Sequence, residues 1–253
     1  MENYKNNLLK RVASLPKRND LEVEYTCIKC RDFRYILNKD GEAYPCECQA
    51  KVISQQILHE SGISNYFKSK KFSNYIADNE ELYEAKNKAI NYCVEFKHNS
   101  DYNKSFLLNG QSGAGKSHLG IAISLNLIES NIGCRYIDYR KFITEMRQNV
   151  MNLENYNKLM RSYQNVRVLY IDDFLKGKIG DSDINYIFEL LNYRYQNLKP
   201  TIISTEKTID ELKEYDEAIA SRIIEMCGGI NGNIVTFKNK YINYRLRETT
   251  ITI

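Results

Sequence analysis

The stretch Gly110-Gln111-Ser112-Gly113-Ala114-Gly115-Lys116-Ser117 decides the fold of this chain. It fits the pattern G-x-x-x-x-G-K-[ST], and it joins the apolar run 105–110 to a helix predicted over 116–130. Glycines at these spacings let the backbone curl so that successive N–H groups point at one phosphate, and the helix N-terminus adds partial positive charge. Lys116 would reach the β- and γ-phosphates of a nucleotide, and the Ser117 hydroxyl would bind Mg²⁺. A chance glycine-rich turn is the alternative, but it does not explain the full motif between a strand and a helix.

A second motif predicts where the metal is held. The apolar run 168–171 ends in Asp172-Asp173, and Asp172 comes 56 residues after Lys116, which leaves room for one strand–helix unit between them. Asp172 would hold Mg²⁺ directly or through water, and Asp173 could polarise the attacking water. The alternative is that two acidic residues at a strand end only begin a polar loop.

Apolar runs alternate with helical periodicity along the rest of the chain. Such an alternation predicts an α/β fold, with a parallel sheet covered by helices on both faces. The predicted strands are 105–110, 134–139, 166–174, 200–205 and 234–238. The predicted helices are 49–59, 80–98, 116–130, 140–161, 184–198 and 208–226, with 64–75 as a connector.

Four cysteines near the N-terminus have the spacing of a zinc site. Cys27-x-x-Cys30 and Cys46-x-Cys48 are separated by fifteen residues, and two such pairs can complete a tetrahedron around Zn²⁺. A bound zinc ion would explain how about 50 residues with few apolar side chains fold. Residues 1–60 are therefore predicted to be a small zinc-binding domain, and 61–253 a larger domain. The alternatives are unrelated thiols, a redox C-x-x-C pair, or His59 replacing one cysteine. Three other cysteines are expected in the core: Cys93, Cys134 and Cys227.

Composition limits the class of protein. The 253 residues carry a net charge of +4, and 43% are hydrophobic, which excludes intrinsic disorder. No apolar run approaches 18 residues and the N-terminus has no apolar signal region, so a cytoplasmic protein without membrane segments is expected. The excess positive charge lies within residues 1–71, and it is compatible with weak contact to an anionic partner such as DNA.

Taken together, these segments resemble the DnaC/DnaI-type replicative helicase loaders, a branch of the AAA+ P-loop ATPases that includes phage and clostridial relatives. The resemblance covers nearly the whole chain. It rests on CIKCRDFRYIL with PCEC, GQSGAGKSHL, VLYIDDF, LNYRYQNLKPTIIST, EAIASRI and KYINYRLR. IstB-type transposition helpers share the ATPase core but generally lack the four-cysteine segment, so they remain the alternative family. A small-molecule P-loop kinase is disfavoured, because neither an acceptor pocket nor a mobile lid is readable.

The resemblance implies roles for further residues. Ser204 and Thr205 would occupy the sensor-1 position that reads the γ-phosphate, although Glu206 stands where many relatives have Asn. Arg222 matches the arginine finger that enters a neighbouring subunit's site, and Arg245 matches the sensor-2 arginine. Surface salt bridges are the alternative for both arginines. His118, next to the phosphate loop, would lie near the nucleotide or only pack there.

The resemblance also implies partners and a reaction. It implies ATP hydrolysis with Mg²⁺, slow because the motif is Asp-Asp rather than Asp-Glu. The expected partners are a hexameric replicative DNA helicase and single-stranded DNA, with self-association through the arginine finger. The first twelve residues are expected to form a short helix, in a region that engages the helicase in this family. The α-helical lid common in AAA+ proteins is predicted to be missing or vestigial, because 15 residues follow the last predicted strand.

Overall fold

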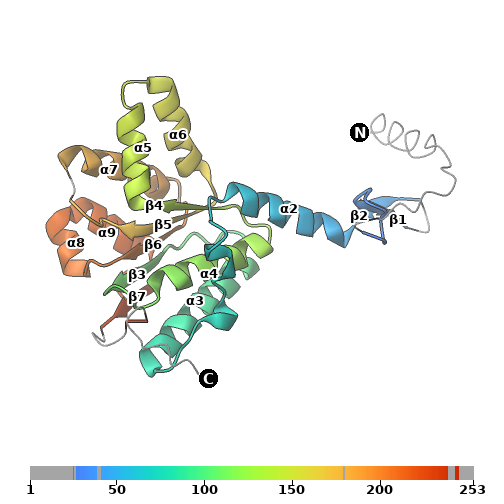
Figure 1. The fold of residues 1–253 in the computed structure, drawn as a ribbon, viewed down its shortest axis with the longest axis horizontal. Coiled ribbons are helices and arrows are strands. Elements are labelled where there is room, and N and C mark those ends of the chain that lie inside the picture. Colours follow the sequence, from blue (N-terminus) through green and yellow to red (C-terminus); the bar gives the residue numbers. More distant parts are fainter. Residues whose placement is uncertain (1–24, 26, 39–40, 179, 239–242, 245–253) are drawn as a thin grey trace, which may run out of the picture. The chain divides into compact units, whose positions relative to one another are not determined.

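The protein is described by a computed structural model that covers residues 25, 27–38, 41–178, 180–238 and 243–244. Its chain divides into two compact units, residues 1–49 and 50–253, which are considered one at a time (Figure 1). The division falls within the helix α2 (Glu47–Glu60). Two of the sequence predictions, the helix over residues 1–12 and the role of Arg245, lie outside the described residues. The predicted lack of a lid concerns a segment of which only 238 and 243–244 are described, so it stays a prediction.

The larger unit is built on a five-stranded sheet in which every pair of neighbouring strands is parallel. The strand order is β4-β5-β6-β3-β7, so β3 lies between two strands that come later in the chain. This sheet confirms the predicted α/β class. The strands are β3 (Phe106–Gly110), β4 (Cys134–Asp138), β5 (Val168–Phe174), β6 (Thr201–Thr205) and β7 (Ile234–Phe237).

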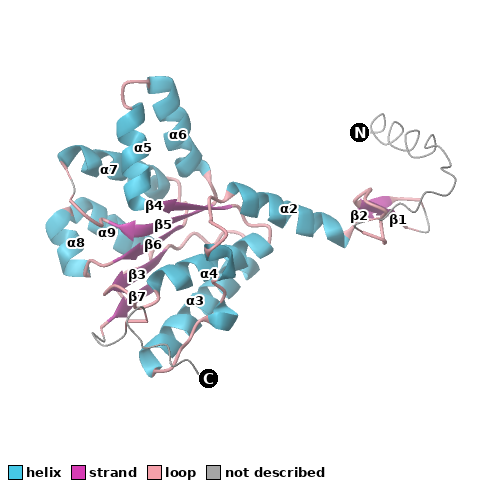
Figure 2. Cartoon of the chain, viewed as in Figure 1, coloured by secondary structure: helices cyan, strands magenta, loops and turns pink. Residues whose placement is uncertain are grey.

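Helices cover both faces of the sheet (Figure 2). One face is covered by α3 (Glu80–His98) and α4 (Lys116–Glu129), preceded by two short 3-10 turns, η1 (Phe67–Ser69) and η2 (Phe72–Asn74). The other face is covered by α5 (Tyr139–Asn149), α6 (Leu153–Asn165), α7 (Asp181–Gln196), α8 (Ile209–Tyr215) and α9 (Glu217–Met226).

Strand β5 shows how the sequence divides the core. Because side chains alternate along a strand, Val168 and Tyr170 face the helices α3 and α4, while Leu169 and Ile171 face α5 and α7. All four side chains are fully buried. Burial of an aliphatic side chain of this size stabilises the fold by about 1.5 to 3 kcal/mol. The same alternation carries Asp172 to the α4 side of the sheet, beside the phosphate loop.

Two helices replace the single helix predicted over 140–161. The break lies at 150–152, where Met151 is 94% exposed and Asn152 caps the next helix by accepting a hydrogen bond of 3.1 Å from the N–H of Asn155. The helix predicted over 208–226 is also two helices. Asp216 ends α8 and caps α9 through the N–H of Ile219, at 2.8 Å. The two helix predictions are wrong for the same reason. A short polar side chain that accepts a hydrogen bond from the backbone favours the start of a new helix over the continuation of the preceding one.

The smaller unit contains a two-stranded antiparallel hairpin, β1 (Tyr35–Leu37) and β2 (Ala43–Pro45). The sequence predicts no strand in this unit. A hydrogen bond of 3.1 Å from the N–H of Gly41 to the carbonyl of Asn38 closes the hairpin loop. Across the ranges that the structure describes, no helix is both long enough and apolar enough to span a membrane.

Candidate nucleotide and metal sites

The phosphate loop connects β3 to α4, as the motif predicts. Gly115 caps α4 with φ of 90°, a left-handed conformation that favours glycine. A Cβ atom on Gly115 would also lie 2.8 Å from the ring of Tyr75, so the loop has no room for a side chain there. Gly113, with φ of 77°, is packed more closely still, since a Cβ there would lie 2.1 Å from the side chain of Asn243. The Gly113 carbonyl accepts a hydrogen bond of 3.1 Å from the N–H of Tyr244. The loop is therefore held in its curled shape from two sides.

Lys116 lies inside this curl. Its side chain is buried, and its ammonium donates hydrogen bonds to the carbonyls of Gly110 at 2.7 Å and Gln111 at 2.5 Å. Burial lowers the pKa of Lys116 to about 8, although the carboxylates of Glu206 and Asp173 act in the opposite direction. A desolvated ammonium at the N-terminus of a fourteen-residue helix fits the phosphates of a nucleotide.

Asp172 is the point where hydroxyl groups from three strands and α4 meet. Its Oδ1 atom accepts hydrogen bonds from Ser117 at 2.9 Å and Tyr170 at 2.8 Å, and it also accepts one from Ser204. Tyr136 donates to Oδ2 at 3.4 Å. Asp172 is 4% exposed, and these donors compensate for its burial.

Strand register explains this convergence. Tyr136 pairs with Tyr170, and Ile203 pairs with Ile171, so Ser204 follows on the strand next to Asp172. A helix residue, Gly120, lets the ring of Tyr170 approach, because a Cβ there would lie 2.3 Å from the ring. The Ser117 hydroxyl and the Asp172 carboxylate are oxygen donors of the kind that Mg²⁺ prefers, and their positions fit the predicted metal site.

Asp173 points to a different set of partners. It has φ of 54°, and its carboxylate forms an ion pair of 3.1 Å with Lys176, which also pairs with Glu206 at 3.2 Å. Burial raises the pKa of Asp173, and Lys176 partly offsets that rise. Burial would raise the pKa of Glu206 too, but hydrogen bonds from Lys176 and Ser112 lower it overall. Asp173 and Glu206 thus share one cation beside the phosphate loop.

The remaining nucleotide-site predictions have distinct surroundings. Ser204 contacts Asp172 and accepts a hydrogen bond of 3.1 Å from the N–H of Asp173. The Thr205 hydroxyl donates to the carbonyl of Phe174 at 2.7 Å, a bond between the ends of two strands. His118 lies 2.9 Å from the carbonyl of Lys71, so it ties α4 to the segment around η2. His118 and Thr205 thus form hydrogen bonds within the fold, and their places at the nucleotide stay predictions.

Arg222 lies on α9 and contacts α7 of its own chain. Its guanidinium lies over the rings of Phe188 and Tyr195, at 4.9 Å and 5.7 Å from their centroids, and it donates to the side chain of Asn192 at 3.2 Å. These contacts fix the position of the Arg222 side chain, and the residue is partly exposed. Arg222 is therefore positioned by its own domain, and its role in a neighbouring subunit's site stays a prediction.

The four cysteines of the smaller unit form one cluster. The sulfur atoms of Cys27, Cys30, Cys46 and Cys48 all lie within 4.8 Å of one another, and those of Cys27 and Cys46 are 3.8 Å apart. Ligands at about 2.3 Å from Zn²⁺ in a tetrahedron would be about 3.8 Å apart, so the cluster fits this metal. A hydrogen bond from the backbone of Cys30 lowers the pKa of Cys27 to about 7, whereas a hydrogen bond with the Cys30 side chain raises the pKa of Cys48. Cys27 therefore favours the thiolate form that metals bind, and Cys48 would have to lose its proton to a bound metal.

His59 is not among the cluster of metal-binding groups found in the described residues. The other three cysteines, Cys93, Cys134 and Cys227, are buried in the larger unit, as predicted.

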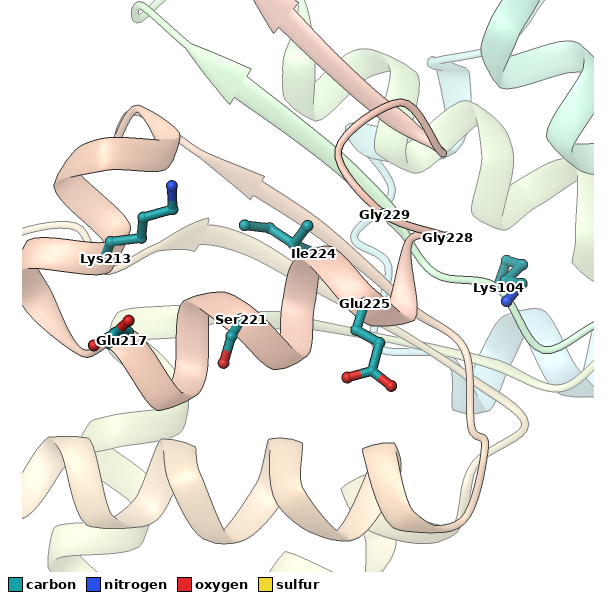
Figure 3. Close-up of a pocket in the computed structure, with 8 residues that line it drawn as sticks. All are labelled: Lys104, Lys213, Glu217, Ser221, Ile224, Glu225, Gly228 and Gly229. Atoms are coloured by element: carbon teal, nitrogen blue, oxygen red, sulfur yellow. The ribbon is translucent and has the colours of Figure 1, made fainter.

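A hollow of about 540 Å³ lies over α8 and α9, away from the phosphate loop, with which it shares no lining residue (Figure 3). In Figure 3, Ser221 and Glu225 point to one side of α9, while Ile224 points to the other. Among the described residues, the groups that could hold a nucleotide or a metal lie at the phosphate loop and at the cysteine cluster instead.

Sequence reasoning missed several residues of the nucleotide site. Tyr136 and Tyr170 read as strand residues, and no motif marks their hydroxyls as partners of Asp172. Tyr75 lies in a segment predicted as a connector, yet it packs against Gly115. Lys176 follows Asp173 by three residues, which was an available signal, because such spacing brings two side chains together in a turn.

The chain is similar in sequence to a known protein family and to two proteins of Bacillus subtilis. A family model that describes the bacterial DnaA ATPase domain matches residues 68–228. The chain is 37% identical over 198 residues to the uncharacterized protein YqaM of Bacillus subtilis, covering 75% of this chain and 62% of YqaM. It is 31% identical over 228 residues to the phage-like element PBSX protein XkdC of the same organism, covering 85% of this chain and 84% of XkdC.

A solved structure shares the fold. The crystal structure of the DnaC helicase loader superposes with a TM-score of 0.62 at 22% identity, and the match covers 69% of this chain and all of that chain. The fold of a DnaC-type AAA+ ATPase is thereby confirmed. Given the phosphate loop, the Asp172 site and the match over 68–228, this chain belongs to the family of the bacterial DnaA-type AAA+ ATPase domain.

Proposed function

We propose that this chain is an ATP-dependent loader that delivers a hexameric replicative DNA helicase onto single-stranded DNA. One observation carries the proposal: a complete phosphate-loop site, in the fold of the DnaC loader, is joined in one chain to a four-cysteine cluster. The first feature supports ATP binding, and the second supports the loader over a transposition helper, which generally lacks the cysteines.

The residues of the site have defined parts in this proposal. Lys116 and the backbone N–H groups at the start of α4 hold the phosphates, while Ser117 and Asp172 hold Mg²⁺. The metal would neutralise charge on the phosphates. Asp173 would polarise water, and its ion pair with Lys176 favours the ionised carboxylate that this role needs. Arg222 would complete the site of a neighbouring subunit.

The smaller unit has a structural part. Four thiolates filling a tetrahedron leave Zn²⁺ no open position, so the metal would hold the fold of residues 27–48 rather than perform chemistry. Several apolar side chains around this unit are exposed, and they would be available to the helicase: Ile28, Phe33, Tyr35, Leu37 and Tyr44.

A loading assay tests the proposal. Tagged chain would be mixed with the replicative helicase encoded beside it or by its host, and with a closed circular single strand. We expect co-purification with the helicase and ATP-dependent transfer of the helicase to the circle. Lys116→Ala should abolish the ATP-dependent transfer. The proposal would be wrong if the chain ignored the helicase and bound duplex DNA in preference to single strands, as expected of a transposition helper.

A further inference from the structure

Lys176 bridges two carboxylates that come from the ends of adjacent strands. Its ammonium lies 3.1 Å from Oδ2 of Asp173, near the end of β5, and 3.2 Å from Oε1 of Glu206, which follows β6. The three side chains are between 31% and 37% exposed. They therefore form one partly open cluster at the carboxyl edge of the sheet, the edge at which the phosphate loop also begins.

This cluster is coupled to the phosphate loop. The side chain of Ser112, which belongs to the loop itself, contributes to lowering the pKa of Glu206. Charges on Glu206, Asp173 and Lys176 all act on the ammonium of Lys116. The two lysines thus approach the loop from different sides, Lys116 from α4 and Lys176 from the turn after β5.

The charges around the loop explain why a second lysine is needed. Three carboxylates, those of Asp172, Asp173 and Glu206, face a region built to bind phosphate. With Lys116 as the only ammonium, Asp173 and Glu206 would repel a nucleotide's terminal phosphate at close range. Lys176 places a positive charge between these two carboxylates and the loop.

We propose that Lys176 is a second phosphate-binding lysine, which contacts the terminal phosphate of ATP while it stays paired with Asp173 and Glu206. The inference rests on the proposed ATP binding. An ammonium has three N–H donors, and the two ion pairs use two of them, so the third can reach a phosphate oxygen. A flexible four-carbon stem lets the group adjust without breaking either pair. Because ADP lacks the terminal phosphate, Lys176 favours ATP over ADP.

Equilibrium binding of the whole chain tests this inference without relying on turnover. The dissociation constants of Mg²⁺-ATP and Mg²⁺-ADP would be measured calorimetrically for wild type and Lys176→Ala. We expect ATP affinity to fall about tenfold, equivalent to about 1.4 kcal/mol, with ADP affinity changing much less. The matched control is Lys178→Ala, which removes the same charge two residues away from an exposed position. It should bind both nucleotides as wild type does.

A second variant separates a phosphate contact from a structural role. Glu206→Gln removes one of the repelling charges, so the double variant Lys176→Ala/Glu206→Gln should recover part of the lost ATP affinity. Loss of packing alone would not be rescued in this way. Thermal unfolding of each variant checks that the fold is kept.

The outcomes distinguish this inference from the proposed function. If Lys176→Ala weakened the binding of ATP and of ADP equally, or left the ratio of their two dissociation constants as in wild type, the role of Lys176 would be overturned. ATP affinity retained in Lys116→Ala would instead overturn ATP binding at this loop. If Lys116→Ala lost ATP affinity while Lys176→Ala kept wild-type affinity for ATP, only the inference about Lys176 would be overturned.

Discussion

The hydroxyl of Ser117 lies 2.9 Å from Oδ1 of Asp172, although 55 residues separate them in the chain. Ser117 belongs to the first turn of α4, and Asp172 lies near the end of β5. The contact joins the two motifs recognised in the sequence into one site. Since both side chains offer oxygen atoms suited to Mg²⁺, the predictions below begin with this pair and its surroundings.

Substitution of Asp172 should affect the metal more than the nucleotide. In Asp172→Asn, four hydroxyl groups still surround the side chain, but the charge that attracts Mg²⁺ is gone. We expect ATP hydrolysis to fall by about a hundredfold or more, with nucleotide affinity in EDTA nearly unchanged. Steady-state hydrolysis across a Mg²⁺ titration measures the first quantity, and calorimetry the second. A wild-type rate in this variant would contradict the metal assignment.

Removal of the Lys116 ammonium should prevent nucleotide binding. Lys116→Ala loses the charge that pairs with the phosphates, so ATP affinity should fall by about a hundredfold or more. Circular dichroism and thermal unfolding should show a retained fold, because the apolar core does not include this side chain. Lys88→Ala, a substitution on α3 outside the loop, serves as the control for nucleotide affinity.

The stability of the chain should depend on pH through Lys116. Its pKa in the folded protein is lowered to about 8, below its ordinary value of 10.5. Between these two values the unfolded chain binds more protons than the folded one, so the free energy of unfolding should rise as pH rises from about 8 to about 10. The rise should be on the order of 2 kcal/mol. Urea unfolding at several pH values measures it, and Lys116→Met should lack this contribution.

Metal analysis of the purified chain should give one Zn²⁺ per molecule. Cys27→Ser removes one of the four clustered thiols, so it should lose the metal and unfold residues 27–48. The larger unit should keep its own unfolding transition, because its core is separate. Cys93→Ala is the control, since Cys93 is buried on α3 and should leave the zinc in place. A folded wild-type protein without metal would refute the zinc assignment.

Arg222 should be required for turnover but not for binding. Arg222→Ala should retain ATP affinity and lose hydrolysis, because the arginine would act in a neighbour's site. Mixing it with Lys116→Ala should restore some activity, since one variant binds ATP and the other supplies the arginine. The cation–π contacts with Phe188 and Tyr195 give the competing explanation, a loss of stability. Lower thermal stability without rescue on mixing, or a rate per chain independent of concentration, would count against the finger.

Local chemistry made several features readable from sequence. The loop at 110–117 and the cysteine pairs each depend on closely spaced residues, and the structure brings each set together. Alternation of apolar strands with helical segments was enough to predict the parallel sheet, because burial on both faces requires continuous apolar runs. The helix break at Asn152 was missed, since capping competes with helix continuation by small free-energy differences.

Contacts between distant segments required the tertiary structure. Strand order places β6 beside β5, and only that order brings Ser204 onto Asp172 and Glu206 onto Lys176. The sequence showed that Glu206 stands where many relatives have Asn, but it could not show that Glu206 pairs with Lys176. The side-chain contacts of a turn depend on which strands become neighbours. The burial that shifts the pKa of Lys116 arises in the same way, from the packing of β3, α4 and the segments around them rather than from the motif itself.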